Sequence, residues 1–272
     1  MSTTSYLERF NYQLAGPEQG RKWIFLHGLM GYGSNWRKII SQMPTERTLT
    51  FDQRGHGRSW KPLTGYSSED YADDLFLIAQ ELGWSNFILV GHSMGGRNAL
   101  SFAHKYPELV SKLVIEDIGP DSSPKAFDDY QNLLKSVPTP FKSKLAAKEF
   151  FLNQWPKLGV VHENAITLGQ YLYSNLEDKS GDQVDWRFSK EAILASVELG
   201  RVKNAWKELS DLMIPALIIR GENSKELSKD VFKKMLAINS MLSGIEITNA
   251  GHWVHAEKSK DFVQAILEFA NR

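Results

Sequence analysis

The stretch that decides the fold spans residues 87–96 and reads Phe-Ile-Leu-Val-Gly-His-Ser-Met-Gly-Gly. The apolar run Phe87–Val90 predicts a buried strand, and the residues that follow the motif predict a helix. Between them stands G-x-S-x-G, which in a strand–turn–helix context forms a sharp turn that exposes the serine hydroxyl. The glycines on either side leave room for strand and helix to approach closely. Ser93 is therefore the candidate nucleophile.

Short apolar runs alternate with longer amphipathic segments through much of the chain. Several runs are apolar throughout, which is typical of parallel strands with helices on both faces. The predicted strands are Trp23–Leu26, Thr48–Phe51, Phe87–Val90, Leu113–Ile115, Ala216–Ile219 and Ile245–Thr248, and the predicted helices are Asn35–Gln42, Ser68–Leu82, Gly95–Tyr106, Ser224–Ile238 and Lys258–Ala270. We expect an α/β fold with a mostly parallel sheet flanked by helices.

The alternation stops between residues 121 and 210. This region has a helical pattern interrupted by prolines and by the Ser180-Gly181 turn. At about 90 residues it is far longer than the ordinary crossover connection that is its alternative interpretation. We therefore expect a helical cap at 121–210, inserted into a core formed by residues 1–120 and 211–272.

The composition excludes several classes of function. The 272 residues include 32 basic and 32 acidic side chains, so no basic field indicates a nucleic acid or an anionic membrane as partner. The chain has no cysteine, which excludes disulfides and thiolate chemistry. It shows no apolar leader and no run of about 18 apolar residues, so we expect a cytoplasmic protein without a membrane span. A small molecule is the expected partner, with no metal and no cofactor.

A histidine near the C-terminus is the candidate general base. Residues 250–253 read Ala-Gly-His-Trp and lie between the last predicted strand and the final helix, at the carboxyl edge of the sheet. A neutral imidazole there can accept the serine proton and return it to the leaving group. The chain order Ser…acid…His is the order that this motif requires. These observations indicate His252.

Two positions compete for the acid that orients His252. The loop after the penultimate predicted strand reads Gly-Glu-Asn-Ser at 221–224, without an aspartate, and leaves Glu222 as a rival. The other candidate position is the end of the strand after the nucleophile, where Glu116 and Asp117 stand together. Adjacent strand residues point to opposite faces, so only one of them can reach His252. We predict Asp117, which is nearer the strand exit.

Two backbone amides are expected to stabilise the oxyanion, those of Leu29 and Met94. Leu29 lies in the His-Gly-Leu-Met-Gly loop that follows the strand Trp23–Leu26, where a second donor is needed, and Met94 follows the nucleophile. We expect the side chain of His27 to pack in its loop and to bond backbone groups. The predicted substrate-binding residues are Trp155, Trp186, His92 and Trp253.

With these residues assembled, the chain resembles the α/β-hydrolases, and within them the small bacterial esterases of the YbfF type, related to the eukaryotic ABHD11 proteins. Shared stretches are His27–Leu29, Gly91–Gly96, Asp117–Pro120, Trp186–Phe188 and Ala250–Lys258. The resemblance implies the α/β-hydrolase fold, the acid at Asp117 and hydrolysis of short-acyl esters or acyl thioesters. The sequence departs from the pattern at Gly119-Pro120-Asp121, where the cap begins.

The predicted function is that of a serine carboxylesterase or thioesterase that forms an acyl-enzyme at Ser93. Three alternatives stay open from the sequence. A carbon–carbon bond hydrolase can use the same triad. A lyase of the menaquinone-pathway type is suggested by Arg97, because that group also reads G-x-S-x-G-G-R. A non-catalytic ligand-binding module is the third.

Overall fold

The computed structural model describes residues 5–158, 165–201 and 203–272. Its centre is a seven-stranded sheet with the strand order β1-β3-β2-β4-β5-β8-β9, parallel except for the antiparallel pairing of β1 with β3. The strands are β1 (Tyr12–Ala15), β2 (Lys22–Leu26), β3 (Arg47–Phe51), β4 (Phe87–His92), β5 (Val110–Glu116), β8 (Ala216–Gly221) and β9 (Leu242–Ile247). The mostly parallel α/β-hydrolase fold predicted from the sequence is confirmed.

All six predicted strands are present, most of them one to three residues longer than the apolar run. Within the seven-stranded sheet, the strand that the sequence did not predict is β1, which lies at one edge. Its four residues are exposed or half-buried, so they lack the apolar run that marks the central strands.

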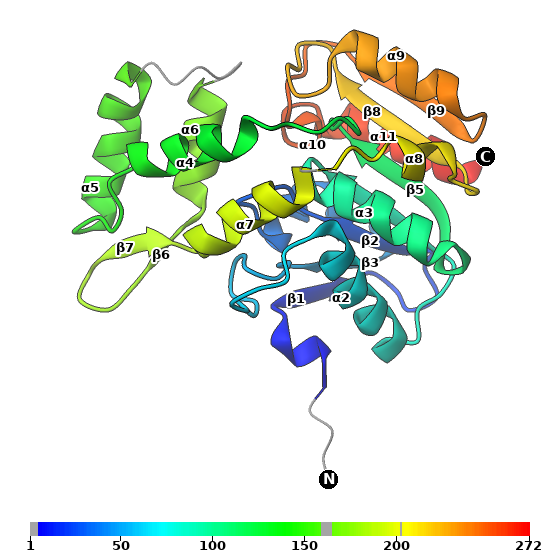
Figure 1. The fold of residues 1–272 in the computed structure, drawn as a ribbon. Coiled ribbons are helices and arrows are strands. Elements are labelled where there is room, and N and C mark those ends of the chain that lie inside the picture. Colours follow the sequence, from blue (N-terminus) through cyan, green and yellow to red (C-terminus); the bar gives the residue numbers. More distant parts are fainter. Residues whose placement is uncertain (1–4, 159–164, 202) are drawn as a thin grey trace.

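Helices cover both faces of the sheet, as Figure 1 shows. One face packs against α2 (Ser68–Glu81), α3 (Met94–Lys105), α8 (Trp206–Ser210) and α9 (Lys229–Ile238). The other packs against α1 (Arg37–Ile40), α10 (Val254–Glu257) and α11 (Ser259–Asn271). Short 3-10 helices η1 (Leu7–Arg9), η2 (Gly33–Trp36) and η3 (Pro107–Leu109) complete this part of the chain. The central strands β2, β4 and β8 bury both of their faces, which is why their sequences are largely apolar.

The chain between β5 and β8 departs from the sheet and forms most of a second group of elements, on the left in Figure 1. It contains α4 (Ala126–Ser136), α5 (Lys144–Glu149), the π-helix η4 (Phe150–Gln154), η5 (Trp155–Lys157), α6 (Ala165–Ser174), a hairpin of β6 (Leu176–Asp178) and β7 (Val184–Trp186), and α7 (Lys190–Arg201). The hairpin was not predicted. Its strands are only three residues long, and its turn contains Gly181 and Asp182 with positive φ.

The predicted bounds of the insertion also include α8, which packs against α3 and α9 beside the sheet. The remaining elements of the insertion share a hydrophobic cluster that contains Trp155 and Trp186, and this cluster continues into Leu29, Met30 and Trp253 at the sheet edge. Apolar packing therefore joins the insertion to the end of the sheet where the candidate catalytic residues stand. In the described part of the chain, no helix is both long and apolar enough to span a membrane.

Candidate active site

Ser93 stands at the turn between β4 and α3 in a strained backbone conformation. Its φ is 52° and its ψ is −119°, in a region that non-glycine residues rarely adopt. The amide of Ser93 donates to the carbonyl of Glu116 at 3.0 Å, which ties the turn to the neighbouring strand. A Cβ atom at Gly95 would lie 2.4 Å from the carbonyl oxygen of Leu26, so only glycine allows this close approach.

The imidazole of His252 is bonded to Asp117. The Nδ1 atom of His252 lies 2.8 Å from Oδ2 of Asp117, and both side chains are buried. Because an ionised carboxylate only accepts, Nδ1 carries the proton and Nε2 is the basic nitrogen. Asp117 also accepts from the amide of Gly221 at 3.0 Å and from the hydroxyl of Ser224. This carboxylate is thus held by three donors.

Ser224 was not singled out from the sequence as a site residue. It belongs to the Gly-Glu-Asn-Ser loop, which was noted only for its lack of an aspartate. Here the loop supplies a hydroxyl and an amide to an acid on the neighbouring strand. The lack of an aspartate in this loop was the signal that could have pointed to this position.

The two rival carboxylates bond elsewhere. Glu222 is exposed and accepts from the amide of Asn249 at 2.8 Å. Glu116 is buried and bonds His255, whose Nδ1 lies 2.8 and 2.9 Å from its two carboxylate oxygens. Glu116, the last residue of β5, and Asp117, which follows it with a φ of 51°, therefore bond two different imidazoles.

The loop after β2 lies beside the turn that carries Ser93. Within the described residues, neither the Leu29 nor the Met94 amide has a hydrogen-bond acceptor. The carbonyl of Leu29 accepts from the Tyr171 hydroxyl at 2.8 Å, a contact that ties the loop to α6. A Cβ at Gly28 would lie 3.3 Å from Cβ of Ser93, so the loop backbone passes close to the nucleophile. The two amides are thus available as hydrogen-bond donors next to Ser93.

Ser93 and His252 line one cavity of about 590 Å³. One wall is a face of α4, with lining residues at the spacing of successive helical turns. The lining also contains one guanidinium, Arg201, at 3.6 Å from the carboxylate of Glu226. The described lining residues are Leu29, Met30, His92, Ser93, Ser123, Ala126, Asp129, Tyr130, Asn132, Leu133, Ser136, Leu168, Tyr171, Arg201, Glu226, His252 and Trp253. The cavity is large enough for a small organic substrate.

The structure separates the four predicted substrate-binding residues into two pairs. His92 and Trp253 line the cavity beside Ser93 and His252. Trp155 and Trp186 lie in the interior of the insertion, where 2% and 3% of their surfaces are exposed, and they do not line the cavity. Helix α4 does line it, and Tyr130 is the aromatic residue that this helix contributes to the lining.

Two buried histidines near the site are held neutral. His27 donates from Nδ1 to the carbonyl of Gly28 and accepts at Nε2 from the amide of Gln53. Burial lowers its pKa to about 4. The predicted role of His27 in loop packing is confirmed. Burial also lowers the pKa of His92 well below its usual value, and the nearby imidazole of His252 adds to this effect.

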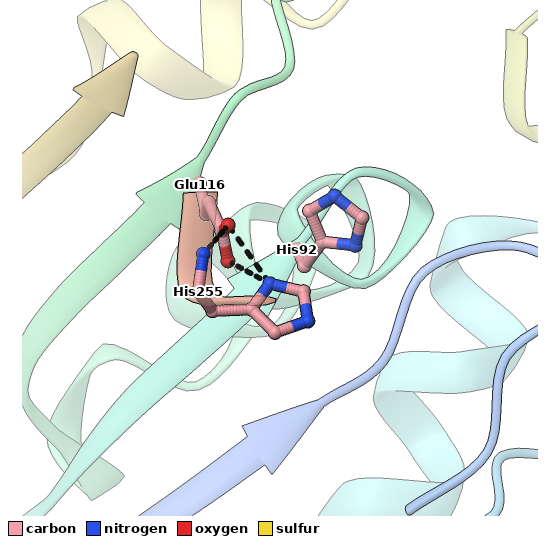
Figure 2. Close-up of side chains that lie close together, drawn as sticks. All are labelled: His92, Glu116 and His255. Atoms are coloured by element: carbon pink, nitrogen blue, oxygen red, sulfur yellow. Dashed lines mark hydrogen bonds and ion pairs between the residues drawn. The ribbon is translucent and has the colours of Figure 1, made fainter. Parts of the chain in front are cut away.

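His92, Glu116 and His255 form a buried cluster whose potential metal-ligand atoms lie within 4.8 Å of one another (Figure 2). Two imidazoles and a carboxylate are common ligands of transition metals. Here both carboxylate oxygens of Glu116 already accept from His255, and Nε2 of His92 donates to the carbonyl of His252 at 3.0 Å. A hydrogen-bond network explains the positions of these atoms.

The guanidinium of Arg97, the residue that suggested a lyase, is bonded to the backbone of the insertion. It donates to the carbonyls of Gly119 and Asp121 where the insertion begins, and to those of Gly200 and Lys203 near its end, at 2.7 to 3.3 Å. Burial lowers the pKa of Arg97 to about 10. Arg97 thus fastens both ends of the insertion to α3.

Comparisons with known proteins agree with this geometry. A family model described as the alpha/beta hydrolase fold matches residues 24–259, most of the chain. The chain belongs to the α/β-hydrolase family. Among curated α/β-hydrolases, an sn-1-specific diacylglycerol lipase ABHD11 from Danio rerio is 32% identical, over 90% of this chain and 77% of the relative. A 2-(acetamidomethylene)succinate hydrolase from Mesorhizobium japonicum is 29% identical, over 90% of this chain and 86% of the relative.

Solved structures of other α/β-hydrolases superpose over nearly the whole chain. The crystal structure of an E-2-(acetamidomethylene)succinate hydrolase has a TM-score of 0.83 and 27% identity, covering 97% of this chain and 95% of that one. A marine microorganism esterase has a TM-score of 0.79 and 28% identity, covering 96% and 98%. The similarity to the α/β-hydrolases predicted from the motifs is confirmed, and the chain is that of a hydrolase of this family.

Proposed function

We propose that this α/β-hydrolase is a serine esterase that cleaves small acyl esters or acyl thioesters through an acyl-enzyme. One observation carries the proposal: a strained serine and a histidine bonded to a buried carboxylate line the same cavity. Nucleophile, base and orienting acid are the three roles that acyl transfer requires.

In the proposed mechanism, the Ser93 hydroxyl attacks the acyl carbon while Nε2 of His252 accepts its proton. Asp117 holds the Nδ1–H tautomer and stabilises the imidazolium that forms. The amides of Leu29 and Met94 donate to the oxyanion, each worth about 2.7–4 kcal/mol in the transition state. The imidazolium then protonates the leaving alcohol or thiol. Water, deprotonated by the same imidazole, releases the acid and restores Ser93.

The 121–210 insertion is the proposed cap that selects the substrate. It contributes α4, α6 and the end of α7 to the cavity walls, whereas Ser93 and His252 come from the sheet edge. Replacing a wall residue should therefore alter which acyl group fits without altering the reacting atoms.

A panel of p-nitrophenyl esters of increasing acyl length, assayed beside acyl-CoA thioesters of matched length, tests the proposal. We expect hydrolysis of the shorter esters that disappears in Ser93→Ala, and labelling of Ser93 by a fluorophosphonate probe. A parent protein that is neither labelled nor active on any ester or thioester would overturn the esterase assignment.

A second candidate is hydrolysis of an anionic substrate, as the name of the succinate-derivative hydrolase suggests. The overall superposition on that enzyme favours it. The described charges of the cavity oppose it, because Asp129 and Glu226 outnumber Arg201. A mono-p-nitrophenyl dicarboxylate assayed beside its neutral counterpart distinguishes the two candidates.

A further inference from the structure

The loop that carries His252 is bonded to the end of β5 at two successive residues. Asp117 bonds the imidazole of His252, and Glu116 bonds both the amide and the ring of His255, all at 2.8 to 2.9 Å. Glu116 is the last residue of β5, and Asp117 follows it in the left-handed region with a φ of 51°. Two successive carboxylates at the end of β5 therefore anchor the 252–255 segment.

A third contact holds the same segment from the nucleophile side. Nε2 of His92, the residue before Ser93, donates to the backbone carbonyl of His252 at 3.0 Å. The rings of His92 and His252 lie 4.6 Å apart, and those of His92 and His255 lie 4.9 Å apart. The turn at Ser93, the end of β5 and the 252–255 segment are thus connected through buried side chains, of which Figure 2 shows His92, Glu116 and His255.

Stability alone gives a poor reason for the Glu116–His255 pair. Removing a carboxylate and an imidazole from water costs several kcal/mol per group when both are charged, and well-packed apolar residues often serve stability equally well. A buried polar pair does restrict the chain to one arrangement, because any other leaves the groups unsatisfied. The residue so restricted lies three positions from the proposed base.

We propose that Glu116 and His255 are positioning residues for His252, which they act on by fixing its loop to the end of β5. The inference rests on the proposed function. Asp117 acts on the imidazole ring of His252, whereas the second anchor holds the loop backbone that carries this ring. A displacement of about 1 Å at a reacting group can cost 10²-fold in rate.

Three variants and a double variant test this role. Glu116→Leu and His255→Phe break the pair, and the phenyl ring retains the packing of His255 on Trp36, where ring centres are 4.4 Å apart. In Glu116→Gln, the amide oxygen can take the place of Oε1, which accepts from both the amide and the ring of His255. The double variant replaces the pair by two apolar side chains and removes the unpaired charge that each single variant can leave.

We expect the leucine and phenylalanine variants to lose on the order of 10–100-fold in kcat with KM within about threefold, because the bonds that anchor the loop are lost. The acid limb of the pH profile of kcat/KM, which reports His252, should shift. Glu116→Gln should stay within about threefold, and the double variant should recover stability without recovering kcat. All rates are normalised to the folded fraction, and if the leucine variant does not fold, His255→Phe alone decides.

A matched control is Glu46→Gln, at the start of β3 and at the opposite end of the sheet. Glu46 is partly buried and accepts from Trp23 and Arg21, so its loss lowers stability without touching the loop. The inference is overturned if the double variant has the parental kcat. It is also overturned if kcat falls only in proportion to the amount of folded protein and the acid limb of the pH profile of kcat/KM does not shift. A parent protein that is labelled by fluorophosphonate yet hydrolyses no ester contradicts the esterase proposal instead. The labelling rates of the variants then test whether Glu116 and His255 position His252.

Discussion

The carboxyl edge of the sheet holds its reactive groups by short hydrogen bonds, whereas the 121–210 insertion contributes one face of α4 and parts of two other helices to the same cavity. At the edge, Asp117 has three donors and Glu116 two. On the insertion side, lining residues such as Ala126 and Leu133 make apolar contacts. This difference implies that edge substitutions alter the rate of the chemical step, while insertion substitutions alter which substrate is accepted.

The largest expected effect is at the edge, in Ser93→Ala. Removing the nucleophile should lower kcat by on the order of 10⁶-fold while the fold is retained, because a triad acts as a unit. Ester hydrolysis and circular dichroism of the purified variant measure both quantities. Residual activity within tenfold of the parent contradicts the serine mechanism.

The next largest effect separates two carboxylates. Asp117→Asn should lose on the order of 10³–10⁴ in kcat, because the orienting carboxylate fixes the tautomer of His252. Glu222→Gln, matched in chemistry, should lose less than about tenfold, since Glu222 only accepts from the amide of Asn249. The reverse ranking would move the acid to the later loop.

Two kinds of insertion residue should then behave differently. Leu133→Ala enlarges the cavity wall and should change the preference between acyl groups by about 10–100-fold, as expected for a change of a few methylenes in an apolar pocket. Trp155 lies in the interior of the insertion, so Trp155→Phe should lower stability and leave the acyl preference nearly unchanged. Equal acyl profiles for both variants would show that α4 does not form the acyl site.

The dependence of stability on pH should report the core rather than the insertion. The folded-state pKa of His27 is lowered to about 4 and that of His56 to about 3, both chiefly by burial. Unfolded chains bind these protons below about pH 6.5, so the stabilisation is present above that pH and is lost as pH falls toward 4. The expected loss at pH 5 is on the order of 2 kcal/mol per histidine. Urea unfolding at pH 7.5 and 5 measures it, and equal values contradict the assignment.

The smallest expected effect concerns the charge of the cavity. Asp129→Asn should raise kcat/KM for an anionic mono-p-nitrophenyl succinate by about two- to fivefold at low salt, because it removes a like charge from the rim. The matched control is Asp128→Asn, an exposed acid on the same helix that does not line the cavity. Identical responses of the two variants would show that only net charge matters.

The sequence by itself predicted the sheet and the location of its reactive edge. The apolar run before Ser93 and the glycines around it admit few other conformations, and parallel strands end at a common edge. The order of Ser93, Asp117 and His252 along the chain therefore predicted that the three residues lie together at this edge. The structure brings Asp117 to His252, and Ser93 and His252 line the same cavity. These predictions depended on local backbone geometry, which short stretches of sequence specify.

Only the tertiary structure decided the contacts between separate segments. Three features depend on how loops and helices pack. They are the bond between Ser224 and Asp117, the bond between Glu116 and His255, and the presence of α4, rather than Trp155 and Trp186, in the cavity wall. Aromatic side chains suit a substrate pocket and a hydrophobic interior equally well, so composition could not distinguish the two. Unlike the pair of Asp117 and His252, these contacts belong to no sequence motif and are set by packing alone.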